Sequence, residues 1–473
     1  MPNFTAKVAG RLRRSKGAPG AGAAGRKTNV LLVMHGSGRG GVEKSLTALC
    51  RQIDRERFRI LVALPGAGPM QQALDRIGVE TRIMQIESWT PFPFLPGERP
   101  GLAFLSTMSQ RVAALVELIR SRQIDLVHSS TLSVLDGAVA ARLAGRTHLW
   151  DINGKPSGSQ EACGSYLSAP TVYGLVDELS GGIVAASRDV KTLLQRYLPN
   201  REVSLIHHGI DLAEFDAAAA RATSVREEYG IAGRKLVTLV GRVAEGKGVD
   251  DFIWAASKVL ELEPATAFLV VGPEQDAALA ARLKALVRSM GLGASIIFTG
   301  SRSDIPSLLR DCNTFVCASR SAGVPYSMLE AMAAGRPVVT TRCGGPEEVV
   351  RDGVTGFQVS VGSGSEMAHR LLTLLRSAAL RDAFGAEGRA VVRYDFSPQL
   401  QARRFERIYQ RLSHCRQRPS FTRLGELILG VTSVIGARTE QLEREVAEMR
   451  GSGVQVSDSV IGRCMARLLG TTK

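Results

Sequence analysis

The chain has 473 residues, of which 44% are hydrophobic and 22% charged, and its formal net charge is +15. This length exceeds what one ordinary hydrophobic core serves, so the sequence predicts two globular domains with tails. The charge lies at the ends: residues 1–28 hold seven Lys or Arg and no acid, and residues 401–473 hold thirteen against seven acids. The nearly neutral middle argues against a nucleic-acid groove, while the basic tails favour an anionic surface as partner.

Seven cysteines are scattered along the chain, and their spacing fits neither a disulfide framework nor a zinc quartet. We therefore expect a reducing, cytoplasmic compartment. The basic N-terminus lacks the apolar core of a signal peptide, and no apolar run is long enough for a spanning helix. The sequence thus predicts neither a secretion signal nor a transmembrane segment.

The first part of the chain, after a Gly, Ala, Arg and Lys-rich arm at 1–28 that we expect to be disordered, alternates short apolar runs with helical patterns. The apolar runs are predicted strands at 30–34, 60–64, 124–128, 148–152 and 182–186. Continuous apolar strands with helical crossovers indicate a parallel sheet that is covered on both faces. We therefore expect a Rossmann-like domain over 29–208.

The second part repeats this pattern after a linker at 209–234. Its predicted strands lie at 236–241, 267–272, 295–298, 314–318 and 337–340. The predicted fold class is α/β, with two Rossmann-like, doubly wound parallel-sheet domains that face each other across a cleft. The second domain is expected over 235–398, and ligands should bind where the strands end.

The C-terminal part is predicted to be helical. A helix over 399–414 is expected to close the second domain. Beyond it, residues 415–473 carry apolar residues at helical spacing, which predicts an amphipathic extension. Its apolar face has three alternative uses: packing on its own body, forming a homodimer, or docking on a membrane.

The first glycine-rich loop, HGSGRGG at 35–41, connects the first predicted strand to a helix that begins near Val42. Glycines there let the backbone approach a pyrophosphate. The loop lacks the third spaced glycine of a dinucleotide fingerprint. The alternative explanation is tight packing between strand and helix.

The second motif, GRVAEGKG at 241–248, nearly matches a P-loop but has Gly248 where a magnesium ligand should stand, which argues against an NTPase. Arg242 and Lys247 remain, at the end of a strand. Both can face one diphosphate and neutralise the charge of a leaving group without a metal. The alternative is two solvated surface cations.

The third motif lies within residues 319–357, where two glycine-led turns each lead into a helix start. In GVPYSMLE at 323–330, Ser327 and Glu330 have the spacing of a capping box. A functional interpretation, compatible with the first, has Glu330 accepting hydrogen bonds from ribose hydroxyls while backbone N–H groups at 326–328 hold phosphate. CGGPEE at 343–348 extends the same surface.

In this order and spacing, the four elements resemble family-4 retaining glycosyltransferases of the GT-B fold, over roughly 29–410. Further matching segments are GGVE at 40–43, IHHGID at 206–211, FTG at 298–300 followed by Asp304 and Ile305, and DGVTGF at 352–357. The resemblance implies that Arg242 and Lys247 bind the donor diphosphate, that Glu330 binds the nucleotide ribose, and that Gly41 lies near the distal phosphate. It implies no metal and no cofactor beyond the nucleotide-sugar co-substrate. The expected donor-binding residues are Gly40, Gly41, Arg242, Lys247, Gly323, Pro325, Tyr326, Ser327, Met328, Leu329 and Glu330.

The sequence departs from the family at two positions. The first glutamate of the family's E-x7-E motif, associated with the transferred sugar, is here Ala322. The histidine that many members carry at the end of the fifth strand is here Asp151, which either accepts a hydrogen bond from a hydroxyl or is a strand-end turn residue. His128, after the fourth strand, is a second cleft candidate, with a buried structural histidine as the alternative. The expected catalytic residues are thus Asp151, His128, Arg242 and Lys247.

The resemblance implies a glycosyltransferase that moves a sugar from a nucleoside-diphosphate donor to a saccharide or lipid-linked acceptor, with retention. Cell-surface polysaccharide or glycolipid synthesis is the expected context, at the inner face of a membrane reached through the basic tails. The alternative is a non-catalytic relative that binds nucleotide-sugars or acts as a scaffold, because Ala322 and Asp151 replace family residues. The two alternatives differ in donor turnover.

Overall fold

The computed structural model describes residues 26–88, 100–154, 169–219 and 224–415. Most of the predicted arm at 1–28 and of the amphipathic extension at 415–473 lies outside these described residues, as does any dimer contact through that extension. In the part that is described, no helix is long and apolar enough to cross a membrane.

The first domain is a seven-stranded sheet in which every neighbouring pair of strands is parallel. Its strand order is β3(Glu80–Ile83), β2(Phe58–Leu64), β1(Thr28–Val33), β4(Leu126–Ser130), β5(Thr147–Ile152), β6(Gly182–Ala185) and β7(Val203–Leu205). The order reverses between β1 and β4, where the loops after neighbouring strands separate and leave room for a ligand. The glycine loop at 35–41 follows β1 at this point.

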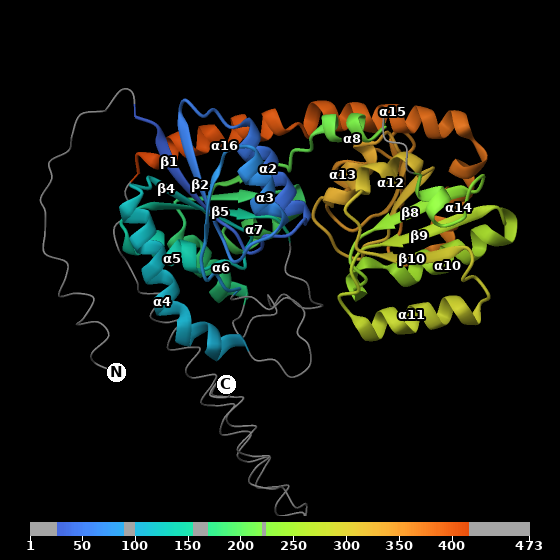
Figure 1. Ribbon diagram of the computed structural model, residues 1–473, viewed down its shortest axis with the longest axis horizontal. Helices are drawn as coiled ribbons and strands as arrows, with labels where there is room; N and C mark the ends of the chain where they lie inside the picture. The colour runs from blue at the N-terminus through green and yellow to red at the C-terminus, as the bar shows by residue number, and fades with distance from the viewer. Residues whose placement is uncertain (1–25, 89–99, 155–168, 220–223, 416–473) are drawn as a thin grey trace, which may run out of the picture.

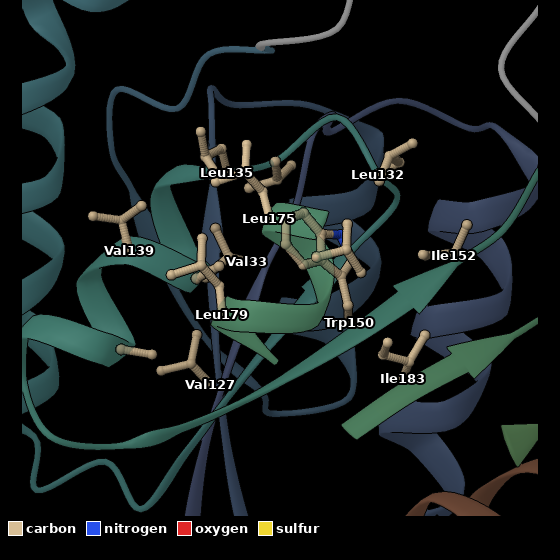
Figure 2. Close-up of a cluster of buried hydrophobic side chains, with 14 of the residues drawn as sticks. Val33, Val127, Leu132, Leu135, Val139, Trp150, Ile152, Leu175, Leu179 and Ile183 are labelled. Carbon is tan, nitrogen blue, oxygen red and sulfur yellow. The ribbon is translucent and has the colours of Figure 1, made fainter. Parts of the chain in front are cut away.

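Helices cover both faces of the first sheet, as continuous apolar strands require. One face packs under α4(Pro100–Ser121), α5(Asp136–Leu143), α6(Ala169–Leu179) and α7(Arg188–Tyr197). Figure 2 shows this core, with Trp150 at its centre among Leu, Val and Ile side chains. Trp150 is fully buried, and its indole N–H donates to the backbone oxygen of Thr131 at 2.8 Å. The other face packs under α2(Gly41–Gln52), α3(Pro69–Arg76) and one further helix from the C-terminus.

The second domain is a six-stranded parallel sheet. Its strand order is β10(Ile296–Gly300), β9(Thr266–Val271), β8(Lys235–Val240), β11(Thr314–Cys317), β12(Val338–Thr341) and β13(Gly356–Val359). The helices around it are α8(Leu212–Ala219), α9(Val225–Glu228), α10(Val249–Leu262), α11(Ala277–Ser289), α12(Ile305–Asp311), α13(Tyr326–Ala333), α14(Gly364–Arg376) and α15(Ala378–Asp395). Two short 3-10 helices, η1(Glu245–Lys247) and η2(Pro346–Glu348), follow β8 and β12.

These two parallel sheets confirm the predicted α/β class (Figure 1). The sequence analysis did not predict three strands, β3, β7 and β13, and each lies at the edge of its sheet. An edge strand is buried on fewer sides, so it needs no continuous apolar run. The exposed Ile83 and the partly exposed Ser204 illustrate this.

The last described helix, α16(Pro398–Ser413), corrects the prediction that it closes the second domain. Its apolar residues Ala402, Phe405, Ile408, Tyr409 and Leu412 pack into the core of the first domain. Figure 1 shows α15 above the second domain and α16 above the first, so the chain crosses back between them. Apolar spacing predicts an amphipathic helix but leaves open which of two sheets it covers.

Candidate functional site

The N-termini of two helices, α2 from the first domain and α13 from the second, meet between the domains (Figure 1). Gly40 caps α2 and Gly41 is its first residue, with no side-chain cap. A Cβ added to Gly41 would lie 2.5 Å from the Cβ of Tyr326, so glycine is required for the helices to approach this closely. Two positive helix ends therefore converge on one place, which favours an anionic ligand there.

Helix α13 begins at Tyr326 behind Pro325, and no side chain caps it. Ser327 lies inside the first turn and its hydroxyl donates to the backbone oxygen of Val240 at 2.9 Å. The predicted capping box between Ser327 and Glu330 is therefore wrong, because the helix starts two residues earlier than an N-cap serine at 327 would require. Ser327 instead ties α13 to the end of β8.

Glu330 is 5% exposed and accepts a hydrogen bond from the ammonium of Lys44 on α2. Burial raises the pKa of Glu330, and the charge and hydrogen bond of Lys44 oppose that rise. Lys44 also lies 6.0 Å from the ring centroid of Tyr326. Sequence reasoning missed Lys44, although it directly follows the GGVE segment. The residue predicted to bind ribose thus holds a cation from the facing domain.

Arg242 and Lys247 come from the segment between β8 and α10. The exposed Arg242 donates to Gln275 Oε1, whereas Lys247 is half-buried and has no ion-pair partner among the described residues. Burial lowers the pKa of Lys247, and the charge of Arg242 lowers it further. A desolvated cation beside a second cation is stabilised by an anion placed between them.

Two loops of the second domain bring Ala322 and Glu348 to the facing domain. The N–H of Gly345 donates to the oxygen of Ala322 at 2.9 Å, and a Cβ on Gly323 would lie 3.2 Å from the oxygen of Asn153. Glu348 accepts from the N–H of Asp189 at 3.0 Å and lies 3.0 Å from His207 Nε2. Although burial alone would raise the pKa of Glu348, these hydrogen bonds hold it below its usual value. Ala322 contributes no carboxylate here.

His128 is fully buried beneath α16, so its prediction as a cleft residue is wrong. Its Nδ1 lies 2.8 Å from the Tyr409 hydroxyl, and its ring stacks on Phe405 with centroids 5.2 Å apart. The alternation of side chains along β4 places residue 128 on the face that α16 covers. The alternative interpretation, a buried structural histidine, therefore describes this residue.

Asp151, at the end of β5, is 3% exposed and lies 3.7 Å from His128 Nε2 through Oδ2. The described residues provide no hydrogen bond to its carboxylate. Nearby, His208 Nδ1 lies 2.8 Å from the Ser45 hydroxyl, to which Gln401 Nε2 also donates. Burial lowers the pKa of His208, opposed by the charge of Asp151. This network, absent from the sequence prediction, joins α2 and α16 to the interdomain segment.

Within the described ranges, no group of three or more His, Cys, Asp or Glu side chains has the arrangement of a metal site. The groups found here between the domains are instead two uncapped helix ends, the cations Lys44, Arg242 and Lys247, and the buried carboxylates Glu330 and Asp151.

Two family models match the chain, one on each domain. The model described as Glycosyltransferase Family 4 matches residues 39–214, and the model described as Glycosyl transferases group 1 matches residues 222–391. Together they cover more than half of the chain, and the first match ends and the second begins near the segment that joins the two sheets.

Curated relatives match chiefly in part of their length. The lipopolysaccharide core biosynthesis mannosyltransferase LpcC of Rhizobium leguminosarum is 31% identical over 44% of this chain and 60% of its own length. A UDP-Gal:alpha-D-GlcNAc-diphosphoundecaprenol alpha-1,3-galactosyltransferase of Escherichia coli is 25% identical over 68% of this chain and 81% of its own. Across the first three relatives, the match spans 54% to 63% of the relative's length.

Solved structures share the whole two-domain fold. HepE of Anabaena, in complex with UDP-glucose, superposes with a TM-score of 0.68 at 20% identity and covers 81% of this chain and 100% of its own. Sucrose-phosphate synthase of Thermosynechococcus elongatus superposes with a TM-score of 0.63 at 18% identity, covering 82% and 99%. At this identity the likeness establishes the arrangement of the two sheets and nothing finer.

Proposed function

Because the chain belongs to the family-4 glycosyltransferases of the GT-B fold, we propose that it transfers a sugar from a nucleoside-diphosphate donor to a saccharide or lipid-linked acceptor. The observation that carries this proposal is Lys247, a half-buried cation without an ion-pair partner among the described residues, next to Arg242. Relatives named for mannosyl and galactosyl transfer in surface-glycan pathways support the reaction class.

The donor diphosphate, in this proposal, lies between the two helix ends. Lys247 and Arg242 neutralise the charge that develops on the leaving group, without a metal and with retention at the sugar. Backbone N–H groups at the start of α2 and α13 add hydrogen-bond donors that are already held in place by their helices. The residues assigned to the donor are Gly40, Gly41, Arg242, Lys247, Gly323, Pro325, Tyr326, Ser327, Met328, Leu329 and Glu330.

Glu330 is assigned to the ribose hydroxyls of the nucleotide. Its carboxylate already holds Lys44, so nucleotide binding either shares Glu330 with Lys44 or displaces that ammonium. Displacement would couple donor binding to movement of α2, because Lys44 belongs to the other domain. Burial raises the pKa of Glu330, and the charge of Lys44 opposes that rise, which favours the form that accepts hydrogen bonds.

Asp151 remains our candidate for an acceptor hydroxyl, since its carboxylate lies at the end of β5 without a hydrogen bond from the described residues. Its small exposure means that a substrate reaches it only when the domains separate. His128 is left out of the catalytic set, because α16 covers it. Ala322 leaves recognition of the transferred sugar to other residues.

The test is a nucleotide-sugar panel of UDP-glucose, UDP-galactose, UDP-N-acetylglucosamine and GDP-mannose, read by mass spectrometry of released diphosphate. We expect one donor to be turned over by the wild type and far less by Lys247→Ala. Calorimetric binding of nucleoside diphosphate with no donor turned over would favour the alternative of a non-catalytic relative. No binding and no turnover would overturn the proposal.

We also propose that the protein docks peripherally on an anionic membrane at the cytoplasmic face. Besides the basic tails, the described structure offers a groove between β7 and α16, lined by Arg404, Arg407 and Arg411. Only Arg411 has an ion-pair partner among the described residues, Glu202 at 3.4 Å, and that pair is exposed. Three guanidinium groups along one helix face suit phosphate headgroups.

Vesicle flotation tests this docking. Full-length protein should float with phosphatidylglycerol vesicles and not with phosphatidylcholine vesicles, and binding should fall in 0.5 M salt, as expected of screened charges. The triple variant of Arg404, Arg407 and Arg411 to Gln should float less if the groove takes part. A full-length chain that ignores anionic vesicles would refute the proposal.

A further inference from the structure

Glu43, in the first turn of α2, holds its carboxylate inside the glycine loop. A Cβ added to Gly36 would lie 2.7 Å from Glu43 Oε1, and one added to Gly40 would lie 2.4 Å from Oε2. The loop therefore wraps around the carboxylate, and its glycines make room for the two oxygens. The residue is only 8% exposed.

This carboxylate has no hydrogen-bond donor among the described residues. Its titratable neighbour is His35, whose Nε2 lies 3.9 Å from Oε1, outside hydrogen-bond range. Burial lowers the pKa of His35, with Glu43 opposing that shift, so the imidazole is mostly neutral at pH 7 and leaves the carboxylate charge uncompensated. A buried carboxylate without donors is costly in a folded chain unless a ligand supplies them.

A structural role for Glu43 explains only part of this geometry. An acid in the first turn of a helix gains from the helix dipole, wherever its side chain points. That gain does not require the two glycines that leave space around the carboxylate oxygens, and it does not supply the missing hydrogen-bond donors. The Glu43 carboxylate is thus a free hydrogen-bond acceptor beside the place where α2 and α13 meet.

We propose that Glu43 binds hydroxyl groups of a sugar ring. An ionised carboxylate accepts hydrogen bonds only, so it suits two neighbouring hydroxyls and repels a phosphate. This inference rests on the proposed function and deepens it. Glu43 supplies, from the first domain, a carboxylate for sugar recognition where the second domain has Ala322. Two sources share this chemistry: the sugar of the donor and the sugar of the acceptor.

The experiment compares Glu43→Ala with wild type, using the donor that the wild type turns over. Donor hydrolysis without acceptor gives the KM of the donor, and transfer gives the KM of the acceptor. Calorimetry with the free nucleoside diphosphate, which lacks the transferred sugar, reports nucleotide binding separately from sugar recognition. We expect the KM of one sugar-bearing substrate to rise about 10- to 100-fold, the range for a hydrogen bond to a charged group, while diphosphate affinity stays within about twofold.

Two further variants separate the role of Glu43 from folding. Gly36→Ala keeps the carboxylate but pushes the flexible end of Glu43 aside, and it should raise the same KM. Glu56→Ala removes a carboxylate whose side chain is 90% exposed, and it should change neither KM. If Glu43→Ala misfolds and binds diphosphate poorly, the KM values of Gly36→Ala decide whether Glu43 recognises a sugar.

The outcomes separate this inference from the proposed function. A higher donor KM assigns Glu43 to the transferred sugar, and a higher acceptor KM alone assigns it to the acceptor. Wild-type turnover with both KM values unchanged in Glu43→Ala and Gly36→Ala would overturn the inference and leave the proposed function standing. A wild type without turnover on any donor overturns the proposed function and, with it, this inference.

Discussion

The two helices that meet between the domains, α2 and α13, begin alike and hold their glutamates differently. Both start without a side-chain cap, and each carries one glutamate that is less than a tenth exposed. Glu330 on α13 is paired with Lys44, whereas Glu43 on α2 has no donor from the described residues. A paired carboxylate is satisfied before any ligand arrives. An unpaired one is built for a ligand, because it gains the hydrogen bonds only then.

This difference separates the two halves of the proposed site. The α13 half, with Arg242 and Lys247, provides cations and helix-end amides, which suit the nucleoside diphosphate. The α2 half adds the N–H groups of its own helix end and the carboxylate of Glu43, a hydrogen-bond acceptor that suits sugar hydroxyl groups. Mutations of side chains on the α13 half should therefore act on nucleotide binding and leaving-group chemistry. Mutations of side chains on the α2 half should act on sugar recognition and closure.

The largest effect is expected from Lys247→Ala, which removes a cation of the α13 half. Turnover of the identified donor should fall about 100-fold or more, the usual loss when a transition-state charge partner is removed. Initial rates of diphosphate release measure this. The matched control is Lys258→Ala, an exposed lysine that pairs with Glu261 on α10. Equal turnover in wild type and Lys247→Ala would remove the phosphate role.

Gly41→Ala should break the contact between the halves. Its Cβ would overlap the Cβ of Tyr326, and neither helix start yields without a shift of backbone. We expect turnover to fall about 10- to 100-fold, because misplacement near 1 Å has that effect, and diphosphate affinity to fall as well, because Gly41 is assigned to the donor. Gly66→Ala, in open space after β2, is the control. Full activity in Gly41→Ala would mean that catalysis does not need this approach.

Nucleotide affinity should distinguish the partners of the Lys44–Glu330 pair. Glu330→Gln should weaken diphosphate binding about tenfold, because a charged acceptor of ribose hydroxyls is lost. Lys44→Met should change it less than about threefold, since Lys44 belongs to the α2 half. Isothermal calorimetry measures both. A comparable loss in Lys44→Met would show that the nucleotide contacts both halves.

The smallest effect concerns stability in acid, where the two domains should also differ. Burial lowers the pKa of His148, on β5, to about 3, and nearby His128 contributes. In the unfolded chain His148 titrates near 6.5, so below that pH the unfolded state binds a proton that the folded state refuses. The free energy of unfolding is therefore not reduced by His148 above pH 6.5. It falls by up to about 1.4 kcal/mol per pH unit on the way to pH 3.

The second domain carries His369 alone among histidines over 235–398, and that side chain is exposed. Between pH 7.5 and pH 5.5, the free energy of unfolding measured in urea should therefore fall more for the first domain than for the second. Trp150 reports on the first domain once Trp89 and Trp254 are replaced by Phe. His148→Gln should flatten the pH dependence and His369→Gln should not. An unchanged pH slope in His148→Gln would contradict the assignment.

Much of the fold followed from local pattern. Strands such as β1 and β9 are continuous apolar runs, and a strand that is buried on both faces has no other composition available. The glycine loop after β1 and the turns before α13 and η2 were likewise predictable, because glycine marks where backbone comes close. The start of α13 differs from the prediction by two residues, because Ser327 has the sequence pattern of an N-cap but its hydroxyl donates to the backbone oxygen of Val240.

Local sequence was enough to predict two parallel-sheet domains, to place Arg242, Lys247 and Glu330 at strand ends and a helix start, and to show that residue 322 is an alanine without a carboxylate. These are local or periodic properties. Three facts needed the folded chain: α16 covers the first sheet and buries His128, Lys44 contacts Glu330, and the Glu43 carboxylate has no hydrogen-bond donor among the described residues. Such facts depend on contacts between residues far apart in the chain. Periodicity shows that a residue has a partner face, and only packing determines which face that is.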